Sequence, residues 1–281
     1  MSAGFADLHL HTVTSDGTQT LAQMVARARA SGLGTIAITD HDAISPELTA
    51  RSAKLQGIEV ITGVELKADF DGVSGELLGY FVDPAAARLL ELLAHMERAR
   101  ERRMDLMLAK CRDAGLDVGI DDVRRHAQGN LGRPHLARAL VESGLAEDTD
   151  DVFARLIGRG RPCFVPIEKV GFREAIEILR AAGAAVSVAH PCLMRVGDWD
   201  RFLTLLASAG VHGLETVYPY RTSPTTELTT SPALLAAKAR ERGFLTTGGS
   251  DDHGLGSSKV TLGQIRLGDE HVEALRKVCG A

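Results

Sequence analysis

The sequence predicts a protein of the α/β class, in which parallel strands form either a barrel or an open sheet and helices cover it. Two observations favour this class: short apolar runs alternate with amphipathic helical runs, and polar residues gather where the predicted strands end. The size agrees, because 281 residues with 44% hydrophobic and 25% charged side chains suffice for one large or two ordinary domains with a substantial core.

The N-terminal third of the chain contains the first strands and helices. The predicted strands are 5–12, 34–42, 58–68 and 75–83. Apolar residues at helical spacing predict helices over 20–31 and 46–56. The second of these is introduced by Ser45 and Pro46, which are residue types typical of a helix start.

A helical insertion follows. Between residues 85 and 163 the pattern is helical throughout, so we expect 85–163 to form an inserted subdomain and 1–84 with 164–281 to form a discontinuous main domain. Basic residues outnumber acidic ones by one in the insertion, whereas the remainder of the chain is acidic. We interpret the arginines from Arg98 to Arg103 as a solvated helix face.

Strands and helices alternate again after the insertion. The predicted helices are 172–182, 199–209, 232–242 and 269–278. The predicted strands are 184–190, 211–218, 244–253 with its exit loop, and 261–267. Because no G-x-G-x-x-G follows the first strand and no G-K-[ST] occurs, neither a dinucleotide site nor a P-loop is indicated.

Charge and composition argue against several classes of protein. A formal net charge of −5 argues against tight, non-specific binding of long duplex nucleic acid through a bulk basic field. The four cysteines are far apart and form no C-x-x-C pair, which favours reduced thiols over disulfides. The N-terminus has no signal-peptide pattern and no long apolar run occurs, so we expect a cytoplasmic protein that does not bind membranes.

Histidines and carboxylates mark one end of the predicted strands. Five of the ten histidines lie there: His9, His11, His41, His190 and His253. Carboxylates accompany them: Asp7, Asp16, Asp40, Asp42, Glu65, Glu76, Glu215, Asp251 and Asp252. The carboxyl ends of parallel strands converge on one face of an α/β fold, and residues two apart on a strand, such as His9 and His11, point to the same side.

This mixture of side chains indicates a metal site. Imidazoles with carboxylates, and no cysteine nearby, suit zinc, manganese or iron. The alternative is a buried hydrogen-bond network without metal. Such a network would require cations to neutralise so many ionisable groups at one buried point.

Six motifs carry a family resemblance. They are DLHLHTVTSDGTQT, AITDHD, GVEL, LLGYFVDP, VAHP and GGSDDHG, and they span residues 7 to 253. In this order they resemble the PHP (polymerase and histidinol phosphatase) superfamily of metal-dependent phosphoesterases. The helical insertion, which contains GRPHLARAL, is similar to that of the bacterial branch that hydrolyses nucleotide 3′,5′-bisphosphates and trims short RNA from its 5′ end.

The resemblance implies a fold and a metal centre. The fold is a distorted (β/α)7 barrel of the PHP type with an all-helical insertion, and it holds two or three divalent ions of manganese, iron or zinc. By motif, the first ion and its bound hydroxide are held by His9, His11, Glu65 and Asp251. The second is held by Glu65, Glu76 and His190, and the third by Asp16, His41 and His253.

Position 76 departs from the relatives, which carry histidine there. A glutamate is a harder ligand, so it favours manganese or iron over zinc or weakens the second site; the alternative is that Glu76 pairs with a surface cation. For the substrate phosphate, Arg133 and His135 of the GRPHLAR segment match the family motif, and Arg195 is a weaker candidate. Tyr218 either borders the pocket or only packs.

We therefore expect a metal-dependent phosphoesterase that converts nucleotide 3′,5′-bisphosphates, such as adenosine 3′,5′-bisphosphate, to AMP and phosphate by attack of a metal-activated hydroxide. Trimming of short oligoribonucleotides is a related activity of the same site. Two alternatives stay open: a phosphatase for a small metabolite such as histidinol phosphate, and a PHP module that binds metal without catalysis.

Overall fold

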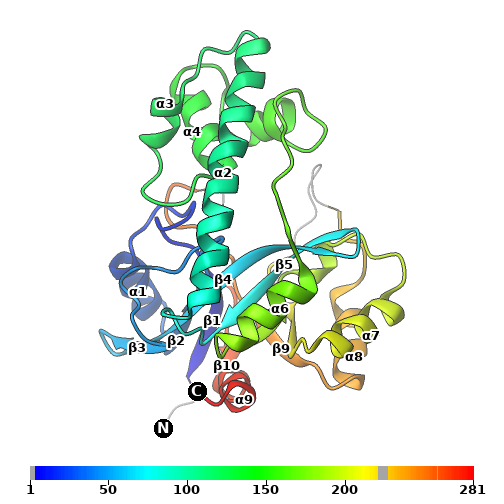
Figure 1. The fold of residues 1–281 in the computed structure, drawn as a ribbon. Helices are drawn as coiled ribbons and strands as arrows, with labels where there is room; N and C mark the ends of the chain where they lie inside the picture. The colour runs from blue at the N-terminus through cyan, green and yellow to red at the C-terminus, as the bar shows by residue number, and fades with distance from the viewer. Residues whose placement is uncertain (1–3, 221–226, 258) are drawn as a thin grey trace.

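The computed structural model describes residues 4–220, 227–257 and 259–281 (Figure 1). One sheet runs through the molecule in the order β10-β1-β2-β4-β5-β7-β8-β9, and the short strands β3 and β6 both pair with β4. The strands are β1 (Phe5–Leu10), β2 (Thr35–Ile38), β3 (Ser52–Leu55), β4 (Ile58–Phe70), β5 (Val73–Tyr80), β6 (Val170–Gly171), β7 (Ala185–Val188), β8 (Gly213–Val217), β9 (Leu245–Gly248) and β10 (Leu267–Gly268).

The sheet curls until the segment after β9 meets β1. The segment after β9 hydrogen-bonds to β1: the Asp251 amide donates to the His9 carbonyl at 2.9 Å, and the His11 amide donates to the Asp252 carbonyl at 3.0 Å. The approach is so close that a Cβ at Gly249 would lie 2.3 Å from the His9 Cβ, so only glycine fits there. The result is a nearly closed barrel, which confirms the predicted fold class.

Not all the strands are parallel, and here the prediction from the sequence was wrong. β4 and β5 form an antiparallel hairpin, β5 pairs antiparallel with β7, and β1 pairs antiparallel with β10. Only Asp71 and Gly72 connect β4 to β5, with φ angles of 52° and 95°. A two-residue turn with positive φ at both positions joins neighbouring antiparallel strands, whereas a parallel pair needs a long crossover.

The helix predicted over 46–56 and most of the strand predicted over 261–267 are also wrong. Residues 52–55 form β3, which pairs antiparallel with β4 through a second tight turn, where Gln56 and Gly57 have φ angles of 50° and 87°. Apolar spacing in so short a segment does not separate helix from strand, and the cross-strand partner decides. Of 261–267, only Leu267 lies in a strand.

Helices cover the outside of the barrel and bury apolar residues against it. They are α1 (Leu21–Ala30), α6 (Phe172–Ala181), α7 (Trp199–Ala209), α8 (Pro232–Glu241) and α9 (Asp269–Cys279), with a short 3-10 turn, η2, at Pro191–Leu193. Phe70 of β4 packs against Phe172 of α6 and Phe202 of α7, with ring centroids 5.2 and 5.7 Å apart. The sequence predicted these five helices to within a residue or so at each end.

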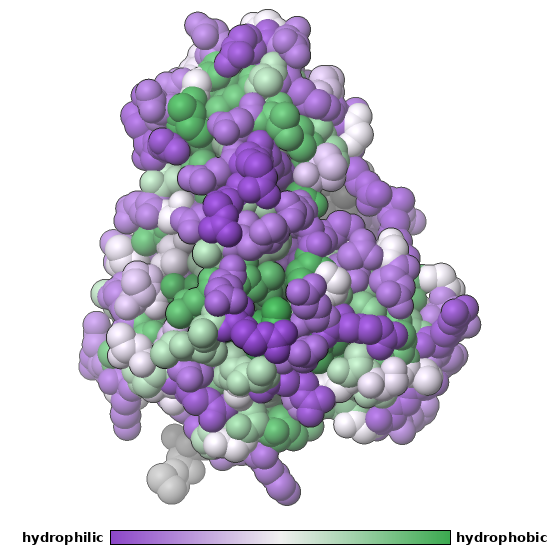
Figure 2. Space-filling model, viewed as in Figure 1, coloured by the Kyte–Doolittle hydropathy of each residue, from purple (hydrophilic) through white to green (hydrophobic). Residues whose placement is uncertain are grey.

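The segment after β5 stands on the barrel as a narrower lobe, which hydrophilic side chains largely cover on the face in Figure 2. It consists of α2 (Ala87–Asp113), α3 (Ile120–Arg124), α4 (Arg133–Glu142), α5 (Thr149–Val152) and a π-helical turn, η1, at Phe153–Ile157. We call this segment, 85–163, the insertion. Its apolar side chains, among them Met107, Leu136 and Val152, form a core of their own. No helix in the described part of the chain is long and apolar enough to span a membrane.

Candidate metal centre

The structure brings the nine predicted ligands together at one end of the barrel. They come from the ends of β1, β2, β7 and β9 and from the β4–β5 hairpin: His9, His11, Asp16, His41, Glu65, Glu76, His190, Asp251 and His253. Four groups of them bring one potential ligand atom per residue to within 4.8 Å of one another. Segments far apart in the sequence thus supply one cluster of nitrogen and oxygen donors.

The first group lies beside β1. The Glu65 Oε2 atom is 3.3 Å from both His9 Nε2 and His11 Nε2, and Asp251 Oδ1 is 3.2 Å from His11 Nε2. His9, His11 and Asp251 form one of the four groups, and His9 with Glu65 and His190 forms another. Glu65 therefore lies between two possible ion positions, as the resemblance implies.

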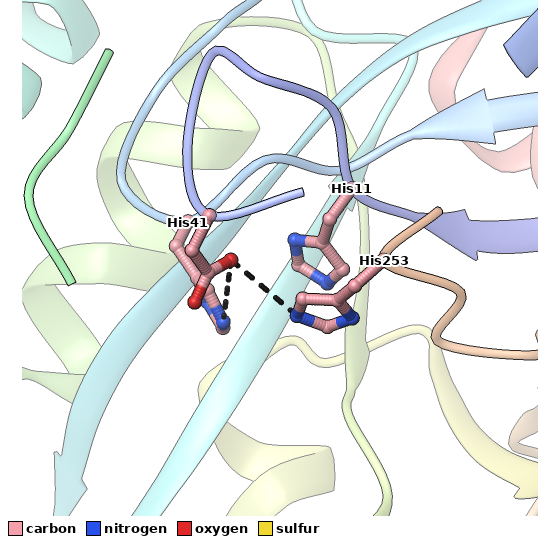
Figure 3. Close-up of side chains that lie close together, drawn as sticks. His11, His41 and His253 are labelled. Carbon is pink, nitrogen blue, oxygen red and sulfur yellow. Dashed lines mark ion pairs between the residues drawn. The ribbon is translucent and has the colours of Figure 1, made fainter. Parts of the chain in front are cut away.

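The second cluster gathers around Asp16 (Figure 3). The Asp16 Oδ1 atom is 3.4 Å from His253 Nε2 and 3.9 Å from His41 Nε2. The ring of His11 stacks on that of His253, with centroids 4.2 Å apart, and completes the group. The sequence assigned His11 only to the first ion, whereas the structure places it between two groups.

Glu76 faces two different partners. Its Oε2 atom is 3.3 Å from His190 Nε2, and its Oε1 atom is 3.0 Å from the Lys67 ammonium. Lys67 lies directly opposite Glu76 in the β4–β5 register. Glu76 is also in a potential ligand group with His41 and Glu65. Both interpretations of position 76, ligand and partner of a cation, thus have a contact in the structure.

The donor atoms fit metal ions. Among the predicted ligands, five buried atoms lack a hydrogen-bond partner in the described part of the chain: His9 Nε2, His11 Nδ1, His11 Nε2, Asp16 Oδ1 and Glu65 Oε2. Leaving buried polar atoms unsatisfied is costly, so they need a partner that the protein does not supply. A mixed imidazole and carboxylate set at this spacing suits zinc, manganese or iron.

Two of the predicted ligands, His11 and Asp16, are already in the ionisation state that a metal needs, whereas His41 is not. Burial and the neighbouring imidazoles of His253 and His41 lower the pKa of His11 to about 3, so its ring is neutral. Burial opposes charge on Asp16, but His41 and His253 hold the pKa of its carboxyl well below the usual range. Burial likewise opposes charge on His41, yet Glu65 and Asp16 raise its pKa to about 9. Binding an ion at His41 would therefore release a proton.

Other carboxylates at the strand ends orient the ligands. Glu215, on β8, lies 3.0 Å from His9 Nδ1 and accepts the His190 amide at 2.8 Å. Asp40 accepts hydrogen bonds from the Thr12 amide and hydroxyl and from the Ser15 hydroxyl. The sequence grouped these acids with the ligands and gave them no separate role. A carboxylate on the second nitrogen of a ligating histidine fixes the ring and its tautomer.

Two predicted ligands sit in unusual backbone conformations. His190 and Asp251 have φ angles of 26° and 54°, which non-glycine residues rarely adopt. The Asp251 Oδ2 atom accepts the Tyr218 hydroxyl at 2.8 Å and pairs with Lys259, so Oδ1 is left to face the histidines. Strain of this kind persists where surrounding contacts enforce it, which is common at functional sites.

A cavity of about 370 Å³ opens over the cluster, within the roughly 300 to 1,000 Å³ typical of small-molecule sites. Part of its lining consists of predicted ligands, and we call this part the barrel wall: Asp16, His41, Glu65, Glu76, His190, Asp251 and His253. The part of the lining that the insertion supplies, which we call the insertion wall, carries four arginines: Arg100, Arg103, Arg133 and Arg138. Lys67 and Lys259 also line the cavity.

The three residues predicted to contact phosphate differ in position. Arg133 lines the cavity, and its guanidinium carbon lies 5.1 and 5.9 Å from the ring centroids of Phe153 and Phe164. His135 is buried behind it, where its Nδ1 accepts the Gly132 amide at the start of α4. Arg195 is exposed and is not among the described residues that line the cavity. Of these three residues, only Arg133 lines the cavity over the cluster.

The interpretation of the Arg98 to Arg103 run as a solvated face was wrong for two of its members. Arg100 is only 7% exposed, and its guanidinium pairs with Asp42 at 2.6 Å. Arg103 lines the cavity. Helical spacing separates Arg100 and Arg103 from Arg102, which is exposed and pairs with Glu168. The apolar spacing of α2 could have shown this, because Arg100 lies four residues after the buried Met96 and Arg103 four residues before the buried Met107.

Several known proteins are similar to this chain. A family model described as the PHP domain matches residues 7–150. A 5′-3′ exoribonuclease of Haemophilus influenzae is 34% identical over 212 residues, which cover 74% of this chain and 77% of that protein. A 3′,5′-nucleoside bisphosphate phosphatase of Chromobacterium violaceum is 28% identical over 97% of this chain and 93% of its own length.

A solved structure gives the same picture. The crystal structure of a candidate metal-dependent phosphoesterase from Bifidobacterium adolescentis superposes with a TM-score of 0.85 at 29% sequence identity. The match covers 99% of this chain and 96% of that one. The likeness thus includes both the barrel and the insertion.

Proposed function

Because the chain belongs to the PHP domain family and is a hydrolase of phosphoric ester bonds, we propose that it removes a phosphate group from nucleotides that carry more than one. The model substrate is adenosine 3′,5′-bisphosphate, with AMP and phosphate as products. One observation carries the proposal: the potential metal ligands and four arginines line the same cavity.

The barrel wall supplies the chemistry. We propose that His9, His11, Glu65 and Asp251 hold one ion, that Glu65, Glu76 and His190 hold a second, and that Asp16, His41 and His253 hold a third. Two or three ions of manganese, iron or zinc would neutralise negative charge on the phosphoryl oxygens and lower the pKa of a water molecule. Glu215 keeps His9 in one orientation, and Tyr218 keeps Asp251 in one orientation.

The insertion wall supplies the binding. Guanidinium groups bind phosphate oxygens through paired N–H donors, and Arg133 is the residue best placed to do so. A substrate with two phosphates would place one at the cluster and the other at the arginines. Phe153, Ile167 and Leu193 line the same cavity and provide apolar contact for the uncharged part of a nucleotide.

Short RNA is the second candidate substrate. The relative with 34% identity is a 5′-3′ exoribonuclease, and the rim of the cavity carries six cationic side chains that suit a chain of phosphates. A 5′-phosphorylated dinucleotide or trinucleotide would use the same cluster for a diester bond.

The test is phosphate release by the 281-residue chain with manganese, iron or zinc. The substrates are adenosine 3′,5′-bisphosphate, AMP, histidinol phosphate and 5′-phosphorylated short RNA. We expect the bisphosphate to be the best phosphomonoester, with at least tenfold higher kcat/KM than AMP. Preference for histidinol phosphate would favour the small-metabolite alternative, and no turnover of any substrate would favour a non-catalytic module.

A further inference from the structure

The insertion touches two of the predicted metal ligands directly, through the loops that carry Asp16 and His41. We propose that the insertion positions these two ligands, so that binding of an ion between Asp16, His41 and His253 is coupled to docking of the insertion on the barrel. The inference rests on the proposed function only because it takes these residues as metal ligands.

Asn130, in the loop before α4, forms the first contact. Its side-chain amide donates to the backbone carbonyls of His41 at 3.1 Å and of Asp42 at 2.9 Å. Its own backbone amide donates to the Thr14 carbonyl at 2.9 Å, and its side chain is buried. A Cβ on the preceding residue, Gly129, would lie 2.0 Å from that same carbonyl, so only glycine permits the approach.

Arg100, on α2, forms the second contact. Its Nε and Nη2 atoms both donate to the Asp42 Oδ2 atom, at 2.8 and 2.6 Å. Asp42 has a φ angle of 49°, a conformation that is unfavourable for a residue with a side chain. The turn that carries His41 is therefore held by a buried ion pair from the insertion together with the hydrogen bonds of Asn130.

Arg138, on α4, forms the third contact, this time with the loop of Asp16. Its Nη2 atom donates to the Asp16 carbonyl at 2.9 Å. The backbone at Gly132 packs on the Asp16 side chain, since a Cβ there would lie 3.4 Å from Oδ2. The backbone carbonyls of His41 and Asp16 thus both accept hydrogen bonds from side chains of the insertion.

The other ligands are held differently. Glu215 contacts His9, and Tyr218 and Lys259 contact Asp251, and all three supporting residues belong to the barrel. Loosening the insertion should therefore affect the ion at Asp16 and His41 and spare the ion at His9 and Asp251. Because coupling between two binding events is reciprocal, the ion should in turn strengthen docking of the insertion.

The first experiment titrates Mn²⁺ into the metal-stripped 281-residue chain by calorimetry, with bound metal counted by mass spectrometry. Asn130→Ala and Arg100→Lys both keep the net charge of the centre, so a change in affinity reports ligand position and not the electrostatic field. The matched controls are Gln128→Ala in the same loop and Arg102→Lys on the exposed face of α2.

We expect each variant to weaken the binding of one Mn²⁺ ion roughly tenfold, the loss expected for one or two hydrogen bonds, and to leave the other bound ions within twofold. Both controls should match the wild type. If circular dichroism shows that Arg100→Lys does not fold, Asn130→Ala decides the question. Wild-type affinity for every bound ion in a folded Asn130→Ala variant would overturn the inference.

Hydrogen exchange tests the reciprocal effect. Mn²⁺ should slow amide exchange in residues 128–142 of the wild type, and this protection should be lost in Asn130→Ala. Unchanged exchange in the wild type would overturn the coupling. Neither measurement uses a substrate, so a chain that bound ions as described but hydrolysed no phosphate ester would disprove the proposed function alone.

Discussion

The barrel wall and the insertion wall of the cavity consist of different residue types. The barrel wall consists of imidazoles and carboxylates on the ends of strands, and most of them are almost fully buried. The insertion wall consists of arginines on helices, among which only Arg100 is buried. Since buried anions need cations and a polyanionic substrate needs a complementary surface, this difference indicates a division between metal binding on one wall and substrate binding on the other.

Removing a ligand from the barrel wall should have the largest effect. We expect His11→Ala and Asp251→Ala each to lower kcat at least a thousandfold, because each removes a donor from the ion cluster and leaves its neighbours unneutralised. Phosphate release with saturating Mn²⁺, together with metal content, measures the effect. His95→Ala is the control, since His95 pairs with exposed Glu168 outside the cavity. Normal turnover in either ligand variant would remove the metal assignment.

Removing an arginine from the insertion wall should instead change binding. We expect Arg133→Met to raise KM for adenosine 3′,5′-bisphosphate by ten- to a hundredfold and to change kcat less than threefold, as expected for the loss of one charge-assisted contact to phosphate. Arg195→Met should leave both constants unchanged, because that side chain lies outside the cavity lining. A fall in kcat at constant KM would contradict the assignment of substrate binding to the insertion wall.

The sequence predicted the barrel wall far better than the insertion wall. Spacing and strand ends indicated a cluster of histidines and carboxylates, and the motifs that resemble the PHP superfamily then singled out the nine predicted ligands. Arg100 and Arg103 were missed because the run of charges was interpreted as a solvated face, although Arg100 lies four residues after Met96 and Arg103 four residues before Met107, on the apolar face of α2. The hairpin at Gln56 was missed for a different reason, since pairing with β4 decides its structure.

Acid should destabilise the chain through His135, a buried residue of the insertion. Burial lowers the pKa of His135 to about 4, below its ordinary value of about 6.5, so the folded state favours the neutral ring that caps α4. Its contribution is complete above pH 6.5 and is lost as the pH falls toward 4, because the unfolded chain binds the proton more readily. We expect a loss of about 2 kcal/mol between pH 7 and 5 from this group.

Urea unfolding at several pH values measures that loss. His135→Asn keeps an acceptor for the Gly132 amide but cannot titrate, so its stability should fall less steeply over the same range. Equal slopes for the wild type and His135→Asn would show that His135 does not link pH to stability.

The smallest expected effect concerns Glu76, a predicted ligand on the barrel wall. Glu76 faces His190 with one oxygen and the Lys67 ammonium with the other, so a glutamate and a lysine together carry the net charge of one neutral imidazole. A carboxylate is a harder ligand than imidazole and favours manganese relative to zinc. We expect Glu76→His to shift the ratio of Mn²⁺ to Zn²⁺ dissociation constants roughly tenfold toward zinc.

Competition between the two ions, followed by metal analysis, measures that ratio without substrate. Lys67→Met should tighten binding of both ions several-fold, because it removes a positive charge 3.0 Å from a ligand oxygen. Lys169→Met is the matched control. Lys169 pairs at 2.9 Å with Asp69, which lies on β4 as Lys67 does, but Lys169 does not line the cavity. If Glu76→His left the ratio unchanged, Glu76 would act only as the partner of Lys67, and the second ion would rest on Glu65 and His190.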